Sequence, residues 1–247
     1  MVSQIESPTK PEVIYPDSDG QPMANNTEQF RWLVAVEQNL ESLYADDPNV
    51  FVAGDLFWYP VQGNSKIFTA PDVMVALGRP KGKRLSYKQW EEGNVAPQVV
   101  FEILSPSNTQ DEMDRKLVFY ERYGVEEYYI YNPANNQLRV WLRGEAGLDL
   151  IESVDSWGSP RLGIRFDLSG EELQIYRPDG TPFLSYLEIE KLLEQEQQRA
   201  EQERQRAEQE RQRAEQERQR AEQAAQQMAE MEELLKRYRD RFGDLPE

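Results

Sequence analysis

The sequence of 247 residues contains neither cysteine nor histidine. Without thiols and imidazoles, the chain has no cysteine nucleophile, no Ser-His-Asp triad and no zinc finger, so acid-base chemistry must use Asp, Glu, Lys, Tyr or water. The lack of cysteine also excludes disulfides, as is usual for proteins of a reducing cytosol. We therefore expect a cytoplasmic protein whose chemistry depends on carboxylates and amines.

Long apolar runs and positive charge are also scarce. No stretch reaches the roughly 18 apolar residues of a membrane-spanning helix, and residues 1–8 have no basic leader pattern. The net charge is −17, and the 12 basic and 15 acidic residues from Lys191 onward leave 16 and 30, a net charge of −14, for the first 190 residues. This acidity argues against tight nonspecific binding to DNA. The only obvious basic strip in the globular part is 81–84 with Lys88.

Two short apolar runs of strand length each contain one carboxylate. Asp72 lies in the run 71–77, and Glu102 lies in the run 99–104. Because side chains alternate across a strand, each acid shares a face with the apolar residues two positions away and should point toward the core. An unpaired carboxylate there is costly, so a metal ion, a lysine or an arginine should compensate the charge.

A lysine that can supply this charge follows on a predicted helix. Thr109 and Glu112 have capping-box spacing, and the pattern predicts a helix that ends near Gly124. Lys116 lies at the margin of the apolar face of this helix, from which it can reach inward. An acid on each of two strands and a lysine on a helix are the parts of a divalent-metal phosphodiesterase site, with Asp72 and Glu102 as ligands of one or two Mg²⁺ or Mn²⁺ ions.

Each of these residues also has a purely structural interpretation. Asp72 follows proline and would suit a turn at the start of a strand, and Glu102 would suit a salt bridge at a sheet edge. Lys116 would suit the solvated side of its helix. The order and spacing of the three residues favour a shared site.

The first predicted helix spans residues 27–44, with residue 25, 26 or 27 as its cap. Glu37 falls within its apolar stripe, so either it lies at the edge of the stripe and reaches water, or it brings a further acid to the site. The residues of the predicted stripe are Phe30, Leu33, Val34, Leu40 and Tyr44.

The remaining pattern of the globular part predicts a mixed sheet. Residues 50–59 form a predicted strand with a bulge at Gly54, and 126–131 follow the second helix, which favours a parallel crossover pair. A hairpin partner at 138–142 and shorter strands at 149–152, 162–166 and 173–176 complete the domain. The basic loop 79–90 is either a surface excursion or a flap over the substrate.

From about Pro182 the composition changes to a charged repeat of period seven. Only alanines recur at a seam position, at 200, 207, 214 and 221, and opposite charges meet at helical spacing. We expect a long solvated helix that either remains alone or self-associates through its more apolar ends. These ends comprise Leu187, Ile189, Leu192 and Leu193, and Met228, Met231, Leu234, Leu235 and Tyr238.

Several segments together resemble the Uma2-type family of restriction endonuclease-like proteins, once a domain of unknown function, in the PD-(D/E)XK nuclease superfamily. They are 70–75, 100–107, Glu112 with Lys116 and Tyr120, and 123–131. The resemblance covers roughly residues 27–187. It implies a restriction-endonuclease-like α/β (α+β) fold with a central mixed sheet flanked by helices, and metal ligation by Asp72 and Glu102. Leu104 stands where the superfamily motif has its lysine. The resemblance implies that Lys116 supplies the amine instead, that Glu37 matches an acid of the first helix, and that Asp55 lies near the cleft.

These observations predict a lead-in at 1–20, a nuclease-like domain at 21–187 and a charged heptad helix at 188–247. The leading hypothesis is a metal-dependent endonuclease that cuts DNA, and that forms homo-oligomers if the helix self-associates. A second hypothesis is a weak or inactive nuclease fold that acts as a scaffold, which the acidity and the missing motif lysine favour. A third is a nuclease for a small or structured nucleic acid in repair or in a mobile element.

Overall fold

The computed structural model describes residues 13–18, 20, 24 and 26–243, in two compact units, 1–186 and 187–247. The helices are α1 (Thr27–Leu43), α2 (Gln110–Tyr123) and α3 (Tyr186–Phe242). The strands are β1 (Val50–Gly54), β2 (Trp58–Tyr59), β3 (Val73–Leu77), β4 (Tyr87–Lys88), β5 (Val99–Ile103), β6 (Glu127–Asn132), β7 (Gln137–Arg143), β8 (Leu148–Leu150), β9 (Arg165–Asp167) and β10 (Gln174–Tyr176).

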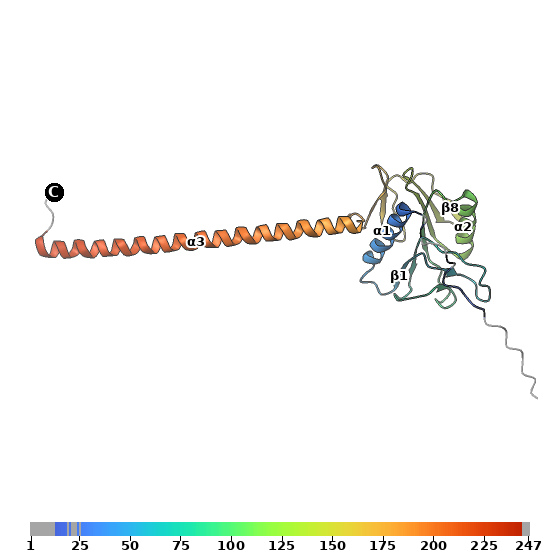
Figure 1. Ribbon diagram of the computed structural model, residues 1–247, viewed down its shortest axis with the longest axis horizontal. Coiled ribbons are helices and arrows are strands. Elements are labelled where there is room, and N and C mark those ends of the chain that lie inside the picture. The colour runs from blue at the N-terminus through green and yellow to red at the C-terminus, as the bar shows by residue number, and fades with distance from the viewer. Residues whose placement is uncertain (1–12, 19, 21–23, 25, 244–247) are drawn as a thin grey trace, which may run out of the picture. The chain divides into compact units, whose positions relative to one another are not determined.

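The first unit is built on a six-stranded sheet in the order β1-β3-β5-β6-β7-β8. The pair β5 and β6 is parallel and is connected through α2, whereas the other neighbouring strands of this sheet are antiparallel. Helices α1 and α2 cover opposite faces of the sheet (Figure 1). The predicted mixed sheet flanked by helices, followed by a long C-terminal helix, is therefore confirmed.

The two faces of the sheet separate the apolar residues into two clusters. Val73 and Phe101 pack on the α1 side, whereas Met74 and Val100 pack on the α2 side with Tyr120. Because strand residues alternate, the residues two positions away from Met74 and Val100 also face α2. These residues are Asp72 and Glu102, so both acids point toward the helix that carries Lys116.

The buried face of α1 differs from the predicted stripe. The buried residues of this helix are Gln29, Trp32, Leu33, Val36, Asn39 and Leu40, whereas Phe30 is 48% exposed. Two polar residues belong to the buried face because each has distant backbone partners: the Gln29 side chain donates to the Ile103 carbonyl at 3.0 Å, and that of Asn39 donates to the Leu184 carbonyl at 2.8 Å. Apolar periodicity alone could not indicate such contacts. The predicted cap is confirmed at Asn26, whose side chain accepts from the Gln29 N–H.

The predicted strand at 50–59 is interrupted rather than bulged. Asp55 has a φ of 47°, in the left-handed region, and separates β1 from β2. Gly54 lies against α1, where an added Cβ would come within 3.1 Å of the Leu33 side chain. The short strand β2 then pairs with β4, which lies in the basic loop.

Ion pairs hold the basic loop 79–90 against the domain. Arg84 contacts Glu92 at 2.6 Å, Arg79 contacts the same carboxylate at 3.2 Å, and Lys81 contacts Glu41 at 2.8 Å. The hydrogen bond from Arg84 lowers the pKa of Glu92. The loop is therefore a tethered surface excursion rather than a flap, and much of its positive charge is neutralised by carboxylates. Residues 1–12 of the predicted lead-in lie outside the described residues, while Tyr15 packs 5.1 Å from the ring of Tyr59.

Candidate active site

Asp72, which directly precedes β3, lies beside Glu102 on the neighbouring antiparallel strand β5. Val73 pairs with Phe101 across β3 and β5, and continuing this register by one residue places Asp72 opposite Glu102. Directly opposed residues have Cβ atoms about 4.5–5.5 Å apart. Asp72 is 8% exposed and Glu102 is 2% exposed. The structure thus brings the two predicted acids together in a place almost closed to water.

Groups from three elements surround the Asp72 carboxylate. Its Oδ2 accepts a hydrogen bond of 2.6 Å from the backbone N–H of Ile103. Burial raises the pKa of Asp72, and Lys116, the Ile103 N–H and a hydrogen bond from Gln29 only partly oppose that rise. The nearby Asp55 carboxylate raises the pKa further. The structure therefore places Asp55 near the acid pair, on the turn that follows β1.

Both oxygens of the Glu102 carboxylate have donors on α2. Oε2 lies 2.7 Å from the Nζ of Lys116, and Oε1 accepts from the Tyr120 hydroxyl at 2.5 Å. Burial raises the pKa of Glu102 to about 7, the Lys116 ammonium counteracts part of that rise, and Asp72 adds to it. Glu102 therefore changes charge near neutral pH, unlike an ordinary solvated glutamate.

Lys116 lies in the middle of α2, a helix whose two ends are well defined. The Thr109 side chain caps the first turn, and Gly124, with a φ of 100°, ends the helix in the left-handed conformation. The Lys116 side chain is 19% exposed, so it is not the solvated helix lysine of the structural interpretation. Burial alone would lower the pKa of Lys116, but Glu102 and Asp72 together raise it. Two carboxylates thus share one ammonium.

Sequence reasoning missed one residue around the acid pair and left the position of another open. From α1 it is Gln29 that reaches Asp72, and a single glutamine among apolar positions gave no signal of that role. Glu37 is half-buried, its carboxylate accepts from Gln38 at 2.7 Å, and burial raises its pKa. The charged neighbour that influences it is Glu41 rather than either acid of the pair. Glu37 thus lies at the edge of the buried face, one of the two positions expected for it, and its Cγ and the Asp72 carbonyl oxygen lie 3.5 and 3.4 Å from the place where a Cβ on Gly54 would stand.

Another fully buried acid shows what a structural carboxylate looks like in this fold. Glu127 is 1% exposed, on the α1 side of the sheet. It accepts hydrogen bonds from Tyr129, from Ser159 and from the backbone N–H of Arg161, at 2.7, 2.5 and 2.6 Å. These donors tie the segment before β9 to the sheet. Glu127 has neither a neighbouring acid across the strand nor a bound ammonium among the described residues, so the acid pair near α2 is a different kind of arrangement.

The chain also matches the model of a known protein family. The model of the family Uma2, described as "Putative restriction endonuclease", matches residues 4–160 of the chain. The chain belongs to the Uma2 family. Membership supports a nuclease-like function for the unit that contains Asp72, Glu102 and Lys116.

Among solved structures, the Uma2 chain is similar to one described as "a putative nuclease belonging to DUF820" from Anabaena variabilis ATCC 29413. The two share 14% sequence identity, with a TM-score of 0.40, over 53% of this chain and 70% of that one. No match was found among curated proteins. The family assignment therefore rests on the family model.

The donor set of this Uma2 site suits a hard divalent cation. No group of three or more Asp or Glu side chains is placed to hold a metal within the part of the chain that the structure describes. Mg²⁺, however, is commonly held by one or two carboxylates and completed by water and substrate phosphate. Asp72 and Glu102 provide two such carboxylates, and both have raised pKa values because a single ammonium does not balance them in their buried setting. A divalent cation would supply the missing positive charge.

Among the described residues, no helix of this Uma2 chain combines the length and the apolar character that crossing a bilayer requires.

Proposed function

We propose that the Uma2 unit is a divalent-metal-dependent endonuclease that hydrolyses phosphodiester bonds of DNA. The observation that carries the proposal is the meeting of three groups from three elements: Asp72 before β3, Glu102 on β5, and Lys116 on α2 at 2.7 Å from Glu102. The family description names a restriction endonuclease, and this set of residues has the composition that such hydrolysis needs. We also propose a cytoplasmic location, because the lack of cysteine suits a reducing compartment.

In this proposal Asp72 and Glu102 would hold Mg²⁺ or Mn²⁺ through carboxylate oxygens. When bound, such an ion activates water for attack and offsets the negative charge that develops on the phosphate. Lys116, which carries three N–H donors, orients the attacking water or donates to a phosphate oxygen. The hydroxyl of Tyr120 and the N–H of Ile103 fix the two carboxylates in place, at 2.5 and 2.6 Å. These contacts are what positions the site before substrate arrives.

Cleavage of plasmid DNA by the purified full chain tests this function. We expect Mg²⁺ or Mn²⁺ to allow conversion of supercoiled plasmid to nicked or linear forms, and EDTA to stop it. In Asp72→Asn, cleavage should fall by about 100-fold or more, because one of the two ligands loses its charge while its size is kept. Agarose gels over a time course measure the rates.

The matched control is Asp149→Asn on the edge strand β8, where the carboxylate is exposed. Cleavage that persists in EDTA would contradict the metal dependence. A failure of both metals to support cutting of any DNA form would overturn the proposed activity.

A scaffold function is the second candidate, because one observation favours it specifically. Both oxygens of Glu102 already have protein donors, so a cation must displace or share with Lys116 and Tyr120. In a scaffold these contacts would simply satisfy a buried acid. Calorimetric titration with Mn²⁺ separates the two candidates: binding that is lost in Asp72→Asn supports the nuclease, and the absence of binding supports the scaffold.

We also propose that α3 mediates self-association. Every side chain described from Tyr186 to Arg241 is exposed, and an apolar residue recurs at every seventh position. Such a strict heptad favours a left-handed coiled coil with a second copy of the helix. The central alanines would allow close approach, and the larger residues at both ends would contribute most of the buried apolar area. The positions of this stripe are Leu193, Ala200, Ala207, Ala214, Ala221, Met228 and Leu235.

Light scattering coupled to size exclusion tests the stripe. We expect a mass of about twice 28.9 kDa for the full chain, and a return toward the monomer in Met228→Lys with Leu235→Lys, because charges on the seam cannot be buried. The matched control, Gln223→Lys with Gln226→Lys, adds the same two positive charges on the outer face of the same segment and should stay dimeric. A monomeric wild-type chain, or seam and outer variants with equal mass, would contradict the assignment.

A further inference from the structure

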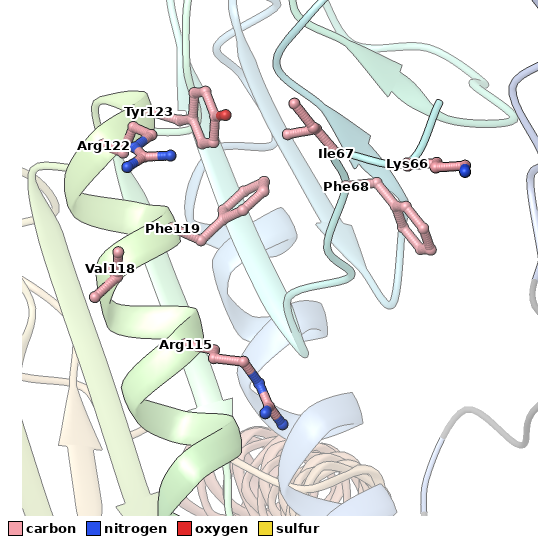
Figure 2. Close-up of a pocket in the computed structure, with 8 residues that line it drawn as sticks. All are labelled: Lys66, Ile67, Phe68, Arg115, Val118, Phe119, Arg122 and Tyr123. Atoms are coloured by element: carbon pink, nitrogen blue, oxygen red, sulfur yellow. The ribbon is translucent and has the colours of Figure 1, made fainter. Parts of the chain in front are cut away.

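A pocket of about 300 Å³ opens between α2 and the segment that leads into β3. One wall consists of Lys66, Ile67 and Phe68, and the α2 side contributes aromatic and cationic side chains (Figure 2). The volume lies at the lower end of the range for pockets that bind small organic groups. The α2 residues that line it are Arg115, Val118, Phe119, Arg122 and Tyr123.

The charge of this pocket is opposite to that of the chain. Lys66, Arg115 and Arg122 are exposed, and none of the described residues that line the pocket is acidic. None of these three cations is in an ion pair of 4.0 Å or less with a carboxylate among the described residues, whereas Arg79, Lys81 and Arg84 of the basic loop are paired. In a chain of net charge −17, a pocket with Arg115 and Arg122 on one wall favours an anionic ligand, while Lys66 on the other wall extends away from α2 (Figure 2).

Aromatic rings give the same pocket an apolar surface. Phe119 and Tyr123 project from α2 toward the segment that holds Ile67, whereas the ring of Phe68 points away from α2 and packs 4.9 Å from that of Phe57 (Figure 2). Behind them lies the fully buried Trp58, whose ring is 5.4 Å from that of Phe119 and 6.5 Å from that of Tyr123. The buried indole supports these two rings, so they offer a firm surface to a flat ligand.

Both walls of the pocket continue into the acid site. Along α2, Arg115 immediately precedes Lys116, and Phe119 immediately precedes Tyr120. Along the other wall, Phe68 is followed four residues later by Asp72. The walls approach each other where the Nζ of Lys116 lies 3.5 Å from the carbonyl oxygen of Ala70. A polymer with one phosphate at the acid pair would therefore place a neighbouring unit at the pocket.

We propose that this pocket binds an unpaired nucleotide of the DNA strand, with the base against Phe119 or Tyr123 and a phosphate near Arg115 and Arg122. The proposal rests on the proposed nuclease function and deepens it, because it assigns a single-stranded substrate or a single-stranded segment within a duplex. Cations along a backbone with aromatic rings for the bases are the usual means of holding single strands. In an intact duplex the bases are stacked on their neighbours, so their faces cannot reach these rings.

Fluorescence anisotropy with a labelled single-stranded oligonucleotide and its duplex, in EDTA, tests the pocket without cleavage. We expect the full chain to bind the single strand more tightly than the duplex. In Arg115→Gln with Arg122→Gln, affinity should fall by about 10-fold or more, and the slope of log affinity against log salt should decrease by about 1.4, since two phosphate contacts are removed. In Tyr123→Leu, which removes a ring from the α2 wall but keeps an apolar side chain there, affinity should fall by about 5-fold or more.

The matched control is Arg206→Gln with Arg213→Gln on α3, which makes the same change in net charge and should bind as the wild type does. Equal affinities of the two double variants, a preference for the duplex, or no binding of any oligonucleotide would each overturn the proposal. Glu102→Gln separates it from the proposed function. If Glu102→Gln and the wild type bind single strands equally while neither cuts DNA, the pocket proposal stands and the nuclease proposal fails. If the wild type cuts DNA, and the pocket variants bind and cut as well as the wild type does, only the pocket proposal fails.

Discussion

Glu102→Gln is expected to reduce DNA cleavage by about 100-fold or more while the domain stays folded. The amide keeps the size of the side chain and one oxygen for Lys116 or Tyr120, but it removes a charged ligand from the acid pair. Initial rates of plasmid nicking in Mg²⁺ measure the loss, and circular dichroism checks the fold. The matched control is Glu127→Gln, a buried acid away from the pair; if that variant remains folded but loses as much activity as Glu102→Gln, the special role of Glu102 is wrong.

The same variant should change how stability depends on pH. Because the pKa of Glu102 is raised from 4.5 to about 7 in the fold, the folded state holds its proton between these values while the unfolded state releases it. The stabilising contribution of the protonated carboxyl is thus complete below about pH 4.5 and is lost as the pH rises through about 7. Glutamine does not titrate. As the pH rises from about 5 to about 8, the free energy of unfolding of metal-free Glu102→Gln should therefore increase by roughly 2–3 kcal/mol relative to that of the metal-free wild type.

Urea denaturation in EDTA at several pH values measures this difference, and subtraction of the wild-type curve cancels the other titrating groups. A difference that does not change with pH would show that Glu102 titrates normally and that the buried pair is balanced by other charges. The same titration predicts that cleavage increases from about pH 6 to about pH 8, because a carboxylate must lose its proton before it can act as a ligand.

Lys116→Met is the second substitution with a large expected effect. We expect cleavage to fall by about 100-fold or more, because the ammonium at 2.7 Å from Glu102 is the only positive side chain in contact with the acid pair among the described residues. Stability should also fall, by about 3 kcal/mol at pH 8, because two buried carboxylates then lack their shared counter-charge. The loss should be smaller near pH 6, where Glu102 can take up a proton. Nicking rates and urea denaturation at both pH values measure these effects.

The double variant Lys116→Met with Glu102→Gln isolates the interaction. If the ammonium acts on the carboxylate, the stability cost of Lys116→Met should become smaller in the Glu102→Gln background. The control for charge alone is Lys83→Met, in the basic loop, which should leave both cleavage and stability nearly unchanged. Normal cleavage by Lys116→Met would remove the lysine from the mechanism, and a large loss in Lys83→Met would restore the flap interpretation of the loop.

The sequence was most informative where local periodicity determines direction. Alternation around β3 and β5 correctly predicted that Asp72 and Glu102 point inward, and the helical pattern correctly placed Lys116 at the inner margin of α2. The strand, helix and strand order correctly predicted the parallel pair β5 and β6. These features depend on residues close in the chain, so a single sequence contains them.

Contacts between distant residues were not predictable in the same way. The basic strip at 81–84 was the obvious candidate for a nucleic-acid contact in the sequence. The sequence does not show that Lys81 forms an ion pair with Glu41 and Arg84 with Glu92. The pocket was missed for the opposite reason. Lys66 and Arg122 are unremarkable surface cations in the sequence, and only the packing of α2 beside the segment before β3 brings them to one pocket.

The amine and the carboxylate of this site belong to separate elements, and that separation affects heat inactivation. Lys116 comes from α2, which is fastened to the rest of the unit partly by the hydrogen bonds of Glu121 with Arg143 and Leu148, at 2.6 and 2.9 Å. A helix held in this way can detach while the strands stay paired. Warming would then switch off cutting before the sheet melts. Recovery on cooling would be as fast as the return of one helix, because the rest of the domain would not have to fold again.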